Sequence, residues 1–143
     1  MRVYLDASFL VALLRTEQAT AQALRFAGGS IDDLIVSDFA VGEAASAIAR
    51  LVRMQEIDDI AGLRLLASLD EWTAASVDLV ATLDSDIRHA AQLVRRFELR
   101  LRMPDAIHLA STVAMRARLA TFDQALGVTA NKLGIELVDL EAG

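Results

Sequence analysis

Residues 3–14 read VYLDASFLVALL, a short apolar run that ends at an acid and is followed directly by a helix-forming run. Residues 3–5 predict a β-strand that is apolar on both faces, as in a parallel sheet covered on both sides. Asp6 lies at the end of this strand, and residues 9–14 predict the helix that follows. A strand followed at once by a helix is the unit from which parallel α/β folds are built.

The remaining chain repeats this alternation of strand and helix. Further strands are expected at residues 34–37 (LIVS), 119–122 (LATF) and 135–138 (IELV), with a weaker candidate near residues 73–77. Apolar residues at helical spacing predict helices over about 39–53, 57–69, 84–101 and 124–133, and one that begins at Pro104. We therefore predict a three-layer α/β sandwich with right-handed crossovers and a central, mostly parallel sheet of four to five strands.

Composition narrows the class of protein. The chain of 143 residues suits one domain over 1–143, and 55% hydrophobic residues argue against disorder. The absence of cysteine excludes a disulfide framework, a thiolate metal site and a cysteine nucleophile. Two histidines, His89 and His108, are too few for a histidine-rich metal site. Any chemistry must come mainly from carboxylates and hydroxyls.

Charge and hydropathy bear on partners and location. A net charge of −6 is not typical of a nucleic-acid-binding protein, although four arginines lie within residues 95–102 and arginine suits phosphate. Asp6 interrupts the apolar run at the start of the chain, so a signal peptide is not expected. No apolar run approaches the roughly 20 residues of a membrane span. We expect a cytoplasmic protein.

Four carboxylates, Asp6, Glu43, Asp105 and Asp123, stand at expected strand ends or early in helices. Each has a structural interpretation: an acid stabilises a helix N-terminus, Asp123 suits an N-cap, and Glu43 suits a solvated helix face. Acids at the carboxyl ends of parallel strands would instead meet where α/β folds bind ligands, and their repulsion would favour Mg²⁺ or Mn²⁺. Two such ions about 3.5–4 Å apart can activate a water for phosphodiester cleavage.

The segments that carry these acids resemble, in order, the PIN domain of VapC-type toxins, the ribonuclease halves of bacterial toxin–antitoxin pairs. The resemblance rests on YLDAS (4–8), SDFAVGEAASAIAR (37–50), PDAIHLAS (104–111), TFDQAL (121–126) and LGIEL (133–137). It covers essentially the whole chain, and every motif position carries the residue type that the family pattern requires.

This resemblance implies a site and its partners. Asp6, Glu43, Asp105 and, at the periphery, Asp123 would bind Mg²⁺ or Mn²⁺ for RNA hydrolysis, with hydroxyl support from Ser8 and Thr121. A homodimer is implied, together with a cognate antitoxin that covers an apolar groove. A hypothesis that follows is that an antitoxin arginine pairs with these carboxylates and replaces the charge of a metal.

Arginine and histidine side chains could assist such a site. We expect Arg100 or Arg102, which precede Asp105, and also Arg50 to contact RNA phosphates; the alternative is a solvated or ion-paired arginine. His108 lies one helical turn after Asp105, yet a water activated by metal needs no imidazole base. A hydrogen-bonded packing role is therefore the favoured interpretation of His108.

Two other functions compete with a nuclease. A phosphatase of the DxD kind needs a second acid where Ser8 stands, and a receiver domain needs a lysine at a late strand end, whereas Lys132 lies in an expected helix. A non-catalytic metal- or RNA-binding module of the same fold stays open. Cleavage of RNA that depends on Asp6 and on the metal distinguishes the nuclease from such a module.

Overall fold

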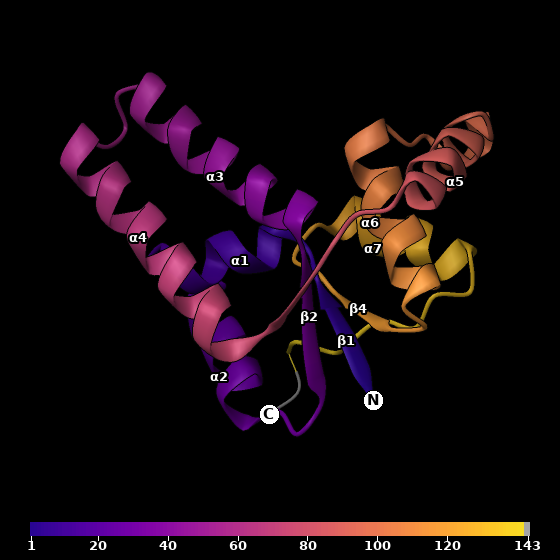
Figure 1. Cartoon of the computed structure of the whole chain (residues 1–143), viewed down its shortest axis with the longest axis horizontal. Helices are drawn as coiled ribbons and strands as arrows, with labels where there is room; N and C mark the ends of the chain where they lie inside the picture. The colour runs from indigo at the N-terminus through magenta and orange to yellow at the C-terminus, as the bar shows by residue number, and fades with distance from the viewer. Residues whose placement is uncertain (142–143) are drawn as a thin grey trace.

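The computed structural model describes residues 1–141, which contain a four-stranded parallel sheet (Figure 1). The strands are β1 (Arg2–Leu5), β2 (Asp33–Ser37), β3 (Asp78–Val80) and β4 (Arg118–Ala120), in the order β3-β2-β1-β4. In the register of the central strand, Tyr4 pairs with Ile35 on one side and with Leu119 on the other. The carboxyl ends of all four strands therefore lie at one edge.

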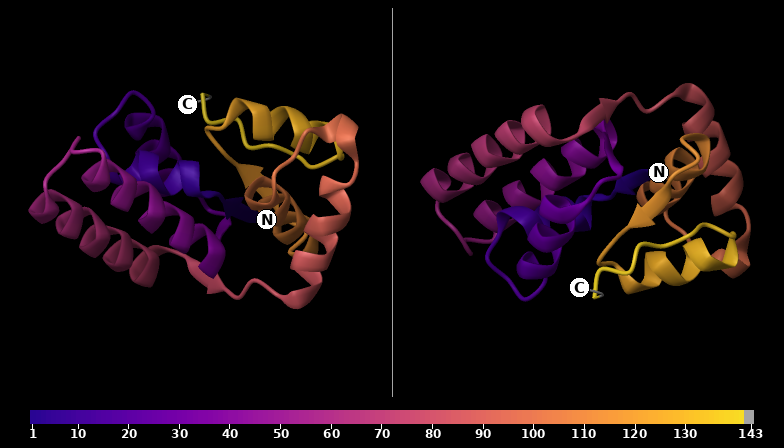
Figure 2. Two further views of the ribbon diagram at one scale, coloured as in Figure 1. Left: turned by 90° about the horizontal axis from the view of Figure 1, so that it is seen from above. Right: turned by 90° about the horizontal axis from the view of Figure 1, so that it is seen from below.

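Helices cover both faces of this sheet. They are α1 (Ala7–Leu14), α2 (Thr20–Gly29), α3 (Asp38–Arg53), α4 (Asp59–Ser76), α5 (Asp84–Val94), α6 (Met103–Ala114), α7 (Gln124–Lys132) and the 3-10 helix η1 (Phe97–Leu99). Figure 2 shows α1–α4 on one side of the molecule and α5–α7 on the other. Successive residues of β1 alternate between two cores: Val3 and Leu5 pack with the first group, and Tyr4 packs with the second. The predicted three-layer sandwich is confirmed.

The local predictions hold best where a buried strand meets a helix. Residues 3–5 and 34–37 fall within β1 and β2, and the predicted strand at 119–122 overlaps the last two residues of β4 and extends two residues beyond it. The candidate strand near residues 73–77 is wrong, because residues 73–76 form the last turn of α4 and β3 begins only at Asp78. The buried hydroxyl of Thr73 donates to the backbone carbonyl of Leu69 at 2.9 Å, which accommodates this β-branched residue inside the helix.

The predicted strand at 135–138 is reduced to one parallel bridge, between Leu137 and Leu119. Leu119 N donates to Glu136 O at 2.9 Å, and Val138 N donates to Leu119 O at 2.9 Å. This segment therefore pairs with the edge of β4 that faces away from β1, through these two hydrogen bonds.

Several helix limits differ from the prediction. Helix α4 begins at Asp59, where Asp58 caps it, and runs to Ser76 instead of ending near residue 69. The helix expected over 84–101 ends at Val94, and η1 and Arg100, with φ of 53°, follow it. Helix α2 is absent from the predicted elements, and Ala23 is its one fully buried residue. None of the helices within residues 1–141 combines the length and apolar character that a membrane crossing requires.

Candidate functional site

The four acids singled out in the sequence stand at the carboxyl edge of the sheet or on helices that leave it. Asp6 directly follows β1 and is the N-cap of α1, and Asp123 lies three residues after β4 and is the N-cap of α7. Glu43 is the sixth residue of α3, which begins directly after β2, and Asp105 is the third residue of α6. Parallel strand order thus places residues from distant parts of the chain at one edge.

Asp6 is held by its neighbours on every side. Its side chain is 3% exposed, and Oδ1 accepts from Phe9 N at 3.0 Å and from the Ser8 hydroxyl at 2.7 Å. Oδ2 accepts from the Thr121 hydroxyl at 2.5 Å. Burial raises the pKa of Asp6 above its usual value, while these hydrogen bonds act in the opposite direction. Ser8 and Thr121, the two hydroxyl residues singled out in the sequence, thus both donate to Asp6.

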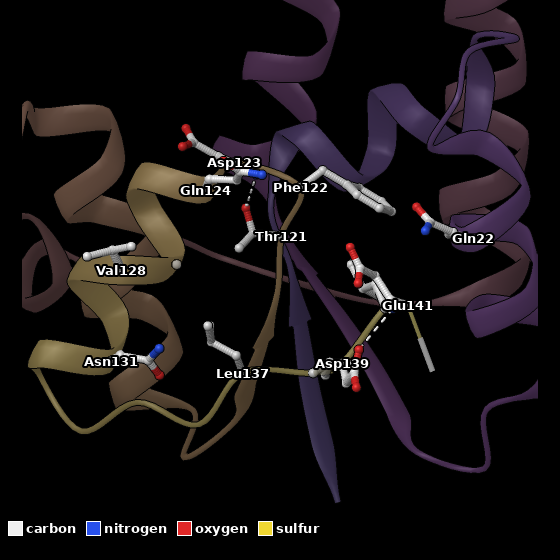
Figure 3. A pocket seen from close by; sticks show the side chains of 13 residues that line it. Gln22, Thr121, Phe122, Asp123, Gln124, Val128, Asn131, Leu137, Asp139 and Glu141 are labelled. Atoms are coloured by element: carbon white, nitrogen blue, oxygen red, sulfur yellow. Dashed lines mark hydrogen bonds between the residues drawn. The ribbon is translucent and has the colours of Figure 1, made fainter. Parts of the chain in front are cut away.

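Thr121 connects two of the acids. Its hydroxyl donates to Asp6 and accepts from Asp123 N at 3.0 Å, the contact drawn as a dashed line at Thr121 in Figure 3. The Ser8 hydroxyl likewise donates to Asp6 and accepts from Phe122 N at 2.9 Å. The Asp123 carboxylate accepts from Leu126 N at 3.1 Å, so it caps α7, as expected from its position.

Glu43 has a partner that lies 65 residues away in the sequence. Its Oε1 contacts His108 Nε2, and His108 Nδ1 contacts the Tyr4 hydroxyl at 2.8 Å. His108 is 3% exposed, so the favoured interpretation as a hydrogen-bonded packing residue is confirmed. The side chain of Glu43 is 32% exposed, and α6 rather than its own helix supplies its partner.

Asp105 shares an electrostatic environment with the other acids. Burial raises the pKa of this half-buried carboxyl, and the negative charges of Asp123 and Glu43 raise it further. The positive charge of Arg102 acts in the opposite direction. The negative charges that act on Asp105 thus come from α3 and from the start of α7, two elements that are distant in the sequence.

The chemistry of these groups fits a hard divalent cation. Carboxylate and hydroxyl oxygens are the donors that Mg²⁺ and Mn²⁺ prefer, and a cation would relieve the repulsion felt by Asp105. The acids do not form a complete set of metal ligands, however, because within residues 1–141 no three acidic or imidazole side chains are arranged to hold an ion as they stand. The Asp6 carboxylate accepts hydrogen bonds from two hydroxyls, and the Glu43 carboxylate contacts His108.

The expected arginines differ in their distance from the acids. Arg102 precedes α6 as its N-cap residue, and its charge lowers the pKa of Asp105. Arg100 and Arg50 are exposed and form no ion pair in the part of the chain that the structure describes. Arg102 is thus placed where its charge acts on a site acid.

Sequence reasoning missed three buried polar residues near the site: Tyr4, Ser37 and Asp86. The Tyr4 hydroxyl contacts both His108 and Ser37, each at 2.8 Å, and Asp86 accepts from Leu83 N at 2.9 Å at the start of α5. A signal was present for Tyr4, a polar-tipped residue in an otherwise aliphatic strand two positions before Asp6. Nothing local marked Asp86 as buried.

A cleft of about 450 Å³ opens beside Thr121 and Asp123 (Figure 3). Helix α7 forms one wall, residues 137–141 form another, and Gln22 of α2 lies across from them. Of the four candidate acids, Asp123 lines this cleft, together with Thr121, which donates to Asp6.

Comparisons with known proteins agree on the fold. The family model for the PIN domain matches residues 3–132, whereas none of the curated proteins matches the chain.

Among solved structures, Mycobacterium tuberculosis VapC20, described as a Sarcin-Ricin loop cleaving toxin, is 18% identical to this chain with a TM-score of 0.72. The match covers 88% of this chain and 93% of that chain. VapBC2 from Rickettsia felis, bound to a promoter DNA fragment, is 12% identical with a TM-score of 0.69, over 96% and 98%. A toxin–antitoxin complex from Klebsiella pneumoniae is 19% identical with a TM-score of 0.57, over 83% and 84%.

Proposed function

Because the chain belongs to the PIN-domain family, we propose that it is a metal-dependent endoribonuclease, the toxin of a VapBC-type toxin–antitoxin pair, in one domain over residues 1–143. The observation that carries this proposal is the position of Asp6, Glu43, Asp105 and Asp123, which stand at the carboxyl edge of the parallel sheet or on helices that leave it. The negative charge of such a site favours divalent cations, and these cations can bind a phosphodiester substrate.

In this proposal Asp6, Glu43, Asp105 and Asp123 hold Mg²⁺ or Mn²⁺. The bound metal would supply an activated water and stabilise the leaving oxygen of a phosphodiester. The protein orients the ligands: Ser8 and Thr121 fix both oxygens of Asp6 through hydrogen bonds of 2.7 Å and 2.5 Å. Outer groups of this kind fix the orientation of a ligand and tune its affinity for metal.

The substrate proposed is RNA, held mainly through its phosphates. The net charge of −6 leaves no general attraction for nucleic acid, so contacts must be local. Arg102 is the first candidate because its charge reaches Asp105, and exposed Arg100 and Arg50 are the next. Phosphate contacts by these residues would position the backbone without reading sequence.

The proposed partners are a cognate antitoxin and a second copy of the chain. The fold shared with a toxin–antitoxin complex supports the first, and the like-charged acids suit an arginine from the antitoxin. Replacing Glu43 by Gln and Asp6 by Asn should then weaken antitoxin binding. Unchanged affinity of both variants would contradict the arginine contact.

RNA cleavage by the purified protein tests the function directly. We expect Mg²⁺ or Mn²⁺ to support cleavage of an RNA pool, and EDTA or Asp6→Asn to reduce it by at least about 100-fold. Asp70→Asn, on an exposed face of α4, is the matched control and should cleave normally. Tight binding of RNA or Mn²⁺ by a folded protein that does not cleave would instead favour a non-catalytic module.

A further inference from the structure

A chain of hydrogen bonds leaves helix α3 at its first turn and returns to the same helix at Glu43. Ala40 N donates to Ser37 Oγ at 3.0 Å, Ser37 Oγ contacts Tyr4 Oη at 2.8 Å, and Tyr4 Oη contacts His108 Nδ1 at 2.8 Å. The chain ends at the contact between His108 Nε2 and Glu43 Oε1. Ser37 and Tyr4 are 0% exposed, so water does not compete for these groups.

The chemistry of the members gives this chain a direction. A carboxylate only accepts, so His108 Nε2 carries a hydrogen and donates it to Glu43. In the neutral ring Nδ1 then accepts from the Tyr4 hydroxyl, which stays protonated because burial raises its pKa. Tyr4 in turn accepts from the Ser37 hydroxyl, whose oxygen accepts from Ala40 N.

The opposite direction would leave a buried hydrogen without an acceptor. If His108 Nδ1 donated to Tyr4, the Tyr4 hydroxyl would donate to Ser37, whose oxygen already accepts from Ala40 N. The Ser37 hydrogen would then have no acceptor in this chain, and a buried donor without an acceptor destabilises the fold.

Packing fixes the imidazole ring as well. The Phe39 ring meets it edge-on at a centroid distance of 5.3 Å, and the Tyr4 ring does so at 5.7 Å. The Thr112 hydroxyl donates to the backbone carbonyl of His108 at 2.7 Å. The ring therefore has one position from which Nε2 reaches Glu43.

We propose that His108, as the neutral tautomer protonated on Nε2, is a positioning residue that holds one carboxylate oxygen of Glu43 and leaves the other for a cation. This inference rests on the proposed function, because it assigns Glu43 as a ligand. Each of three members of the chain stands close in sequence to an acid. Tyr4 lies two residues before Asp6, Ser37 is the N-cap of the helix that carries Glu43, and His108 lies three residues after Asp105 on α6.

The tautomer can be read in the metal-free protein by ¹⁵N–¹H NMR of the histidine rings. The sequence holds only two histidines, and His89→Gln assigns the remaining signals to His108. We expect the spectrum of a neutral ring protonated on Nε2, because the Glu43 carboxylate can only accept from that nitrogen. A ring protonated on Nδ1 would overturn the proposal.

Calorimetric titration with Mn²⁺ tests the consequence for Glu43. We expect His108→Leu and Tyr4→Phe to bind Mn²⁺ about 10–100-fold more weakly. His108→Gln, whose amide can still donate to Glu43, should recover most of that loss, and His89→Gln should match the wild type. Thermal melts identify variants that do not fold. A folded His108→Leu with wild-type affinity would refute the positioning role.

The two measurements separate this inference from the function on which it rests. Wild-type protein that binds no Mn²⁺ and cleaves no RNA, while its ring is protonated on Nε2, contradicts the proposed function alone. Wild-type protein that cleaves RNA with its ring protonated on Nδ1 contradicts the positioning role alone.

Discussion

At the scale of single residues, the acids are held in different ways. Asp6 is buried and fixed by two hydroxyls and a backbone N–H, whereas Asp105 is half-buried and lies among like charges. For both acids burial is the leading cause of a raised pKa. The ionised site is therefore destabilising to the fold, and a bound cation would offset this cost.

Asp105→Asn should make the protein more stable at neutral pH while reducing RNA cleavage. When the pKa of an acid is higher in the folded state than in the unfolded state, the stability of the fold falls as pH rises from the unfolded pKa, near 3.8, to the folded pKa. Above the folded pKa the stability stays at this lower level. The gain in melting temperature should therefore be present at pH 7 and absent near pH 3. A lower melting temperature for the variant at pH 7 would contradict this account.

Thr121→Val removes the hydroxyl of Thr121 while it keeps the volume of the side chain, so the substitution tests the hydroxyl alone. The substitution removes the donor to Asp6 and the acceptor for Asp123 N, so we expect a loss of about 1–3 kcal/mol in the free energy of unfolding, together with weaker cleavage. Urea denaturation measures the first effect and an RNA assay the second. Thr121→Ser keeps the hydroxyl and should remain near the wild type in both.

At the scale of elements, α3 and α4 form a hairpin that extends beyond the sheet in Figure 1, with a close approach at Gly62. A Cβ added there would lie 2.6 Å from Val52 Cγ2, whereas one added at Gly42 in α3 would meet nothing within 4 Å. A neighbouring side chain therefore requires a small residue at Gly62 but not at Gly42.

Substitution by alanine should affect these glycines in opposite directions. We expect Gly62→Ala to cost about 1–3 kcal/mol through overpacking against Val52. Gly42→Ala should stabilise the fold by up to about 1 kcal/mol, because alanine is the better helix former. Chemical denaturation compares the two, and similar effects of the two substitutions would show that contact at Gly62 is not decisive.

At the scale of the whole molecule, α4 carries apolar side chains that the chain does not cover. Ile60 and Leu63 are 61% and 66% exposed, beside a groove of about 310 Å³ lined by Ile48, Val52 and Leu66. Exposed apolar patches of this kind mark interfaces in soluble proteins. The expected homodimer has a suitable surface here.

Leu63→Lys should weaken self-association by at least about tenfold, or about 1.4 kcal/mol, because it places a charge on this surface. Analytical ultracentrifugation measures the dissociation constant. Phe97→Lys is the matched control, since Phe97 is 86% exposed on η1, outside α4. Equal effects of both variants would show that α4 is not the interface.

Local sequence was enough for the parts of the fold in which neighbouring residues decide the conformation. The apolar runs before Asp6 and Asp38 and the Pro104-Asp105 pair marked strand ends and a helix start, since burial on both faces and capping leave a short-range pattern. The candidate acids followed from the same pattern, because the ends of parallel strands share an edge.

Contacts between distant residues required the folded chain. The pairing of Glu43 with His108 spans 65 residues, and Tyr4 and Ser37 join it from two adjacent strands. Residues 73–76 became helix and 135–138 a single bridge because their neighbours, not their own propensities, supply the hydrogen bonds and burial. Periodicity records which face of an element is apolar, but the partner that meets that face is chosen only when the layers pack.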